Sequence, residues 1–177
     1  TTSERGFPNS DNPTEKIIAI TIRVNDDVWS FGLGEFSIDG QECYSYENEE
    51  DLLNSFLDFW HELDPDIVTG WNVRFFDIPY LHNRIVYLLS EKDAKRLSPW
   101  NVTKDRKVKK MNRDYVTVLL YGIEVLDYLD LYQTFTYENQ ESYRLDHIAY
   151  VELGERKMSY DEYENINEFH KNDFQKF

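Results

Sequence analysis

The sequence predicts a single α/β domain with a mixed sheet flanked by helices. Short β-branched runs of strand length alternate with segments whose apolar residues recur at helical spacing, a pattern typical of α/β domains. A length of 177 residues suits one domain with a core and is too short for two ordinary domains. Hydrophobic residues make up 41% of the chain and aromatic residues 16%, which excludes a disordered tail.

The first predicted strands follow a polar segment. Residues 1–16 are polar and contain glycine and proline, so we expect an extended loop there. Residues 17–24 (IIAITIRV) predict a strand, residues 25–27 a turn and residues 28–32 a second short strand. Together they predict a hairpin that enters a buried sheet.

Two helices are predicted from apolar periodicity. The first follows Asn48, a favourable N-cap residue; the acidic residues 49–51 suit the positive end of the helix dipole, and Pro65 ends the helix. Residues 67–72 predict a short strand between the helices, and Pro79 fits the first turn of the second helix. The apolar positions that define the two helices are Leu52, Leu53, Phe56, Leu57, Trp60 and Leu63, then Ile78, Leu81, Ile85, Leu88 and Leu89.

Residues 98–121 predict a long β-hairpin that carries most of its charge on the first strand. The elements expected after it are a strand over 123–126, a helix over 128–137, a helix capped by Ser142 and ending at Gly154, and a helical stretch from about residue 162 to the terminus.

The charge of the chain is unevenly distributed. The net charge is −15, yet residues 1–73 hold 3 basic and 16 acidic residues, and six basic residues fall between Lys104 and Arg113. A protein with this distribution can repel nucleic acid over most of its surface and still bind phosphates at one place. The alternative is that these lysines and arginines protect an exposed hairpin against aggregation.

Composition also limits the class of protein. Cys43 is the only cysteine, which excludes a disulfide framework and a cysteine-based zinc site. No apolar run approaches the roughly 20 residues that cross a bilayer, and no signal-peptide pattern is present, so we expect a soluble, intracellular protein without a membrane partner.

Residues 70–77 (GWNVRFFD) are the first candidate for a chemical site, because polar groups at a strand-to-helix junction are often functional. Asp77 is either a metal ligand near a helix N-terminus or the cap of the following helix. Asp127 and Asp130 are either carboxylates presented at a strand end or an N-cap and a surface charge. The four histidines lack metal-ligand spacing, and no glycine-rich phosphate loop is present.

Several motifs together resemble the exonuclease domain of family B DNA polymerases. The segment from Asn72 to Asp77 resembles the second exonuclease motif, Asn-x-x-x-(Phe/Tyr)-Asp. The stretches GIEVLDYLDLYQTF and SYRLDHIAYVELGERK resemble the region between the second and third motifs. The resemblance covers essentially the whole chain and is closest to the replicative polymerases of large tailed phages.

The resemblance implies a ribonuclease-H-like fold that proofreads DNA by 3′→5′ hydrolysis. Family members use two divalent ions, Mg²⁺ or Mn²⁺, held by four carboxylates, since these ions prefer hard oxygen ligands. By this resemblance Asp77 is a catalytic, metal-binding carboxylate, Asn72 helps to position the substrate strand, and Phe76 packs beneath Asp77 and orients it.

The sequence also departs from the family pattern. The first motif, Asp-x-Glu, and the third, Tyr-x-x-x-Asp, occur nowhere in it. We therefore expect residues 1–177 to form one partial domain that lacks its first core strand. Such a chain is expected to hydrolyse DNA negligibly by itself and to be marginally stable unless another copy or a further segment fills the gap.

By the same resemblance, the hairpin lies at the junction of primer and template and helps to separate the strands. The residues expected to contact DNA are Lys107, Lys109, Lys110, Arg113 and Tyr115. The expected partners are DNA, as a single-stranded 3′ end or a primer–template junction, and the remainder of a polymerase chain. The expected location is the cytoplasm, that of the host cell for a phage protein. The competing interpretations are a non-catalytic DNA-binding fragment that acts through residues 104–115, and an acidic α/β interaction domain whose motifs are coincidental.

Overall fold

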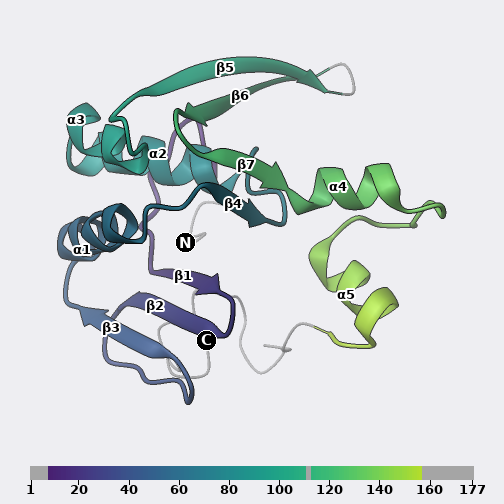
Figure 1. Ribbon diagram of the computed structural model, residues 1–177, viewed down its shortest axis with the longest axis horizontal. Helices are drawn as coiled ribbons and strands as arrows, with labels where there is room; N and C mark the ends of the chain where they lie inside the picture. Colours follow the sequence, from purple (N-terminus) through teal and green to yellow (C-terminus); the bar gives the residue numbers. More distant parts are fainter. Residues whose placement is uncertain (1–7, 111–112, 157–177) are drawn as a thin grey trace.

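The computed structural model describes residues 8–110 and 113–156, and these residues form the predicted mixture of helices and strands (Figure 1). The elements in chain order are β1 (Ala19–Val24), β2 (Asp27–Leu33), β3 (Glu42–Tyr46), α1 (Glu49–Leu63), β4 (Ile67–Gly70), α2 (Asp77–Leu88), α3 (Glu91–Ala94), the 3₁₀ helix η1 (Lys95–Leu97), β5 (Thr103–Lys110), β6 (Arg113–Leu120), β7 (Glu124–Asp127), α4 (Tyr128–Phe135) and α5 (Leu145–Leu153).

The first sheet has the order β1-β2-β3 and is mixed. β1 and β2 form the predicted antiparallel hairpin, in which Val24 pairs with Asp27 across the turn, and β2 is parallel to β3. β3 was not predicted, because its sequence ECYSY has no β-branched residue and is largely polar. It forms because its backbone completes the ladder along the edge of β2.

The single mixed sheet predicted from the sequence is wrong for the described residues, which form three separate sheets. β4 and β7 make a parallel two-stranded sheet, and β5 and β6 make the antiparallel hairpin expected within residues 98–121. Within the described chain β1 pairs only with β2 and β4 only with β7, so each keeps one edge without a strand. Periodicity shows where strands lie but not whether two of them meet.

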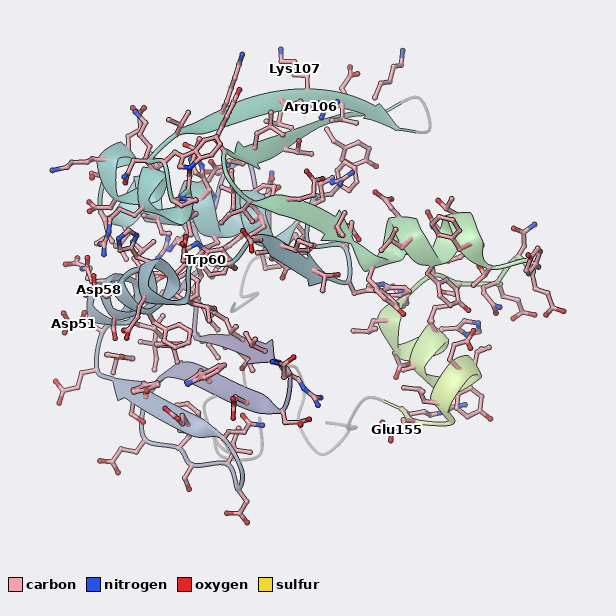
Figure 2. All side chains as sticks on the ribbon, viewed as in Figure 1. Asp51, Asp58, Trp60, Arg106, Lys107 and Glu155 are labelled. Atoms are coloured by element: carbon pink, nitrogen blue, oxygen red, sulfur yellow. The ribbon has the colours of Figure 1, made fainter. Side chains whose placement is uncertain are left out.

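Helix α1 carries the largest part of the core. Asn48 accepts a hydrogen bond from the Asp51 amide at 2.9 Å, which confirms the predicted N-cap. Its apolar stripe is buried against β2, α2 and η1, and the indole N–H of Trp60 donates to the Leu97 carbonyl at 3.0 Å. Figure 2 shows Asp51 and Asp58 on the opposite, outward face. The stripe and the core residues beside it are Leu52, Leu53, Phe56, Leu57 and Trp60, with Phe31, Ile85 and Leu97.

Helix α4 starts at Tyr128 as predicted and ends at Phe135, two residues before the predicted end, whereas α5 differs from the prediction at its start. α5 is capped by Arg144 rather than Ser142, whose hydroxyl instead accepts from the Arg144 amide at 3.3 Å. Its predicted end is confirmed, because Gly154 takes the left-handed conformation with φ of 72°. The helix expected from about residue 162 lies outside the described residues. Among the described residues, no helix is long and apolar enough to cross a membrane.

Candidate active site

A cavity of about 560 Å³ is lined by residues of both β1 and β4, and each of these strands keeps one edge without a strand partner among the described residues. Figure 1 shows the two strands in neighbouring sheets. Its walls are mainly apolar, and residues 70–77, the candidate site segment of the sequence analysis, lie along it. The lining residues that belong to this segment or to the start of α2 are Gly70, Trp71, Val73, Phe76, Asp77 and Ile78. The segment predicted from the sequence as a chemical site therefore lies along a cavity with mainly apolar walls.

The loop over residues 71–76 joins β4 to α2 through a tight turn. Asn72 adopts the left-handed conformation with φ of 62°, which asparagine tolerates better than most residues. Its carbonyl accepts from the amides of Phe75 and Phe76 at 3.3 and 3.0 Å. At Gly70 an added Cβ would lie 3.2 Å from the Val73 side chain, so the strand end leaves little room for a larger residue. The turn fixes the backbone just ahead of Asp77.

Asp77 is the first residue of α2, and Phe76 holds the cap position without a side-chain hydrogen bond. The interpretation of Asp77 as the helix cap is therefore wrong. Its side chain is exposed where it lines the cavity, but the protein packed around the other sides removes water from the carboxyl. This burial raises the pKa of Asp77, and the negative charge of Asp127 adds to the effect. The helix N-terminus in turn favours the charged carboxylate.

Asp127 ends β7 and caps α4, as one of its two interpretations predicted. It is buried, with 2% of its surface exposed. Its Oδ1 accepts from the amides of Asn72 and Leu129, and its Oδ2 from the amide of Arg74, all at 3.0 Å. Asp130 lies on the first turn of α4, 3.8 Å from the guanidinium of Arg74. The sequence pointed to Asp127 as a candidate carboxylate but not to its backbone partners.

Phe76 and Trp71 form aromatic walls beside Asp77. The half-buried ring of Phe76, the N-cap residue of α2, packs against the core, with its centroid 5.7 Å from that of Tyr80 on α2. That it orients Asp77 stays a prediction. Trp71 was not predicted as a site residue, although it stands in the motif segment. Its indole donates to the Tyr143 carbonyl at 3.2 Å, and its ring lies 5.8 Å from that of Tyr132.

The hairpin residues predicted to contact DNA lie on two faces. Opposite residues of an antiparallel pair share a face, so Lys107 opposite Val116 and Lys109 opposite Asp114 lie on one face, and Tyr115 opposite Val108 lies on the other. Both lysines are exposed, and Figure 2 shows Lys107 at the outer edge of the molecule.

Tyr115 is half-buried instead, with its ring 5.4 Å from that of Phe75 in the site loop. The structure thus brings Tyr115, but not these two lysines, to the site. The backbones of Lys110 and Arg113 pair with each other, and their side chains lie outside the described part of the chain.

The donor set for a divalent ion is incomplete in the described chain. No group of three or more His, Cys, Asp or Glu side chains there is arranged to hold a metal ion. Asp77 presents a carboxylate to the cavity, whereas both oxygens of Asp127 are engaged by backbone amides. These residues fit a divalent ion as one ligand of several and not as a whole site.

The comparisons with known proteins identify the same family as the motif at residues 72–77. The family model described as DNA polymerase family B, exonuclease domain, matches residues 1–148. The chain is 47% identical over 116 residues to the DNA-directed DNA polymerase of Escherichia phage RB69, and 36% identical over 116 residues to that of Enterobacteria phage T4. Each of these matches covers 66% of this chain and 13% of the relative.

A more distant relative is the DNA polymerase catalytic subunit of Equine herpesvirus 2 (strain 86/87). It is 28% identical over 170 residues, a match that covers 87% of this chain and 16% of the relative. The chain therefore spans a small part of the length of the polymerases to which it is similar.

Proposed function

Since the chain belongs to the exonuclease-domain family of the family B DNA polymerases, we propose that it forms part of the 3′→5′ proofreading exonuclease of such a polymerase. The family match removes the interpretation of the motifs as coincidental. The observation that carries the proposal is the position of Asp77, at the N-terminus of α2 and on the wall of the cavity beside β4.

In this proposal Asp77 supplies one carboxylate to the metal centre, and Asn72 positions the substrate strand near its 3′ end. The exposure of Asp77 toward the cavity supports a ligand role, because an ion or a phosphate can reach it there. When bound, two Mg²⁺ or Mn²⁺ ions supply activation of water and neutralisation of charge on the phosphate. The described residues furnish one ligand to them, so the other carboxylates come from outside this set.

We propose that the cavity between β1 and β4 is the place of a further core strand that the described residues do not supply, the one that bears the Asp-x-Glu motif in the family. Two facing strand edges and mainly apolar walls support this assignment, because an inserted strand would satisfy both sets of backbone groups at once. With that strand in place the two sheets would merge into one ribonuclease-H-like sheet, and the hairpin β5–β6 would be an insertion in it.

The experiment that tests the exonuclease proposal uses a 3′-labelled single-stranded oligonucleotide with Mg²⁺ or Mn²⁺. We expect no stepwise loss of nucleotides from the folded chain alone. We expect such loss from a longer chain that also carries the Asp-x-Glu and Tyr-x-x-x-Asp motifs, and its abolition by Asp77→Ala. Hydrolysis by the longer chain that survives Asp77→Ala would contradict the assignment of Asp77.

A non-catalytic DNA-binding role of the hairpin is the second candidate. The exposed Lys107 and Lys109 on one face favour it, because phosphate contacts need accessible cations. The two functions differ in their need for metal: the exonuclease requires a divalent ion at Asp77, whereas binding by the hairpin does not. DNA binding that persists in EDTA and in the Asp77→Ala variant would belong to the hairpin.

A further inference from the structure

Asp127 is a buried carboxylate with backbone partners only. Within the described part of the chain it forms no ion pair, and its three hydrogen bonds come from amides of two separate segments. One partner, Leu129, belongs to the helix that Asp127 caps. The other two, Asn72 and Arg74, lie 55 and 53 residues away in the loop ahead of Asp77.

The loop depends on this carboxylate for its shape. Asn72 holds a left-handed backbone conformation, and its amide points to Asp127 rather than to a turn partner. An amide that is shielded from water costs free energy when it has no acceptor, and the half-buried amides of Asn72 and Arg74 both find their acceptor in Asp127. A carboxylate offers two oxygens with four lone pairs and can serve three donors, whereas an amide side chain would place its own NH₂ group against one of them.

We propose that Asp127 is a positioning residue of the exonuclease site: it holds the turn at Asn72 and Arg74 that leads into Asp77, whose side chain lines the cavity. This inference rests on the proposed function and extends it, because the family motif assigns roles to Asn72 and Asp77 but none to Asp127. Asp127 acts through the loop, and its engaged oxygens are not offered to a metal ion.

The variant Asp127→Ser separates the two structural roles of this residue. Serine is itself a good N-cap, so its hydroxyl can keep the bond to the Leu129 amide, but it is too short to reach the loop amides. Asp130→Asn is the matched control, because it removes the same charge on the same helix from a side chain that faces the guanidinium of Arg74.

Amide hydrogen exchange on the chain tests whether Asp127 holds the loop. In Asp127→Ser we expect the protection of the Asn72 and Arg74 amides to fall roughly tenfold to a hundredfold, with the Leu129 amide and the amides of the β1–β2 ladder unchanged. Asp130→Asn should leave all of them unchanged. Equal loss of protection across the molecule, or no loss at Asn72 and Arg74, would overturn the inference.

Binding of a 5′-fluorescein oligo-dT with a free 3′ hydroxyl, measured in Ca²⁺, tests the link to substrate. Asp127→Ser should weaken binding of the oligonucleotide about tenfold. In a chain that already carries Asn72→Ala, it should weaken binding no further, because both changes remove the same contact with the DNA. Additive losses would overturn the inference. A wild-type chain without preference for a free 3′ end would instead overturn the proposed function, and hydrogen exchange would still decide whether Asp127 holds the loop.

Discussion

The guanidinium of Arg84 and the carboxylate of Glu49 form a buried two-point ion pair between α2 and α1. Arg84 donates from Nε and Nη2 to the two oxygens of Glu49 at 2.8 and 2.6 Å, and both residues are 4% exposed. Its Nη1 donates to the Pro13 carbonyl at 2.8 Å, and Glu49 also accepts from the Ile17 amide at 2.7 Å. One pair thus fixes both helices and the segment that leads into β1.

Loss of one partner of this pair should destabilise the chain strongly. Arg84→Ala leaves the Glu49 carboxylate buried without its cation, and such changes cost about 3 to 5 kcal/mol. The free energy of unfolding, measured with urea, checks this value. The control is Lys95→Ala, which breaks the solvent-exposed pair between Lys95 and Glu91 and should change the free energy of unfolding far less than Arg84→Ala does. Equal effects of the two variants would contradict the buried pair.

The pKa of Asp77 makes stability depend on pH. The folded chain raises the pKa of this carboxyl, so the protonated group stabilises the fold below the pKa of the unfolded chain. That contribution is lost as the pH rises through the higher pKa of the folded state. Asp77→Asn should therefore increase the free energy of unfolding at about pH 7 and change it little at about pH 3. A variant that is less stable than wild type at neutral pH would show that the carboxylate stabilises the fold.

The hairpin face that carries Lys107 and Lys109 should determine how strongly DNA binding weakens with salt. Lys107→Ala combined with Lys109→Ala should lower affinity and reduce the slope of log K against log salt by about 1.4 for single-stranded DNA, roughly 0.7 for each phosphate that the variant no longer neutralises. Fluorescence anisotropy over a salt series measures that slope. Lys92→Ala, at an exposed position on α3, is the control. A slope unchanged by the double variant would assign the phosphate contacts elsewhere.

Tyr115 should act through its ring contact with Phe75. Tyr115→Phe keeps the aromatic pair and should leave the free energy of unfolding unchanged. Tyr115→Ala should lower it by the free energy of the lost apolar burial and, in addition, by about 0.5 to 1.5 kcal/mol for the ring contact. Thermal unfolding of wild type, Tyr115→Ala, Phe75→Ala and the variant with both changes completes a double-mutant cycle, which isolates the energy of the ring contact. If Tyr115→Ala weakens DNA binding without changing stability, the ring stacks on a base instead of packing on Phe75.

Local signals in the sequence predicted most elements but not their assembly. Asn48, the apolar stripe and Pro65 predicted α1, because these signals act within one helix. β3 was missed because its short sequence has no β-branched residue, although its backbone ladder and the ring of Tyr44, stacked on Phe31, hold it to β2. The partners of Asp127 lie in a loop far away in the sequence, and no local pattern reports such a bond. The site segment itself was recognised because its polar and aromatic residues form one short motif.

Among the described residues, β1 and β4 each keep an edge without a strand partner, and such edges would affect the behaviour of the chain in solution. An unpaired strand edge with apolar neighbours is a template for any extended peptide, including a strand from a second copy. Self-association through these edges would rise with concentration and would compete with the core strand that we propose for the cavity. A short synthetic β-strand peptide added in excess should then act as a chaperone, keeping concentrated samples monomeric by occupying the cavity first.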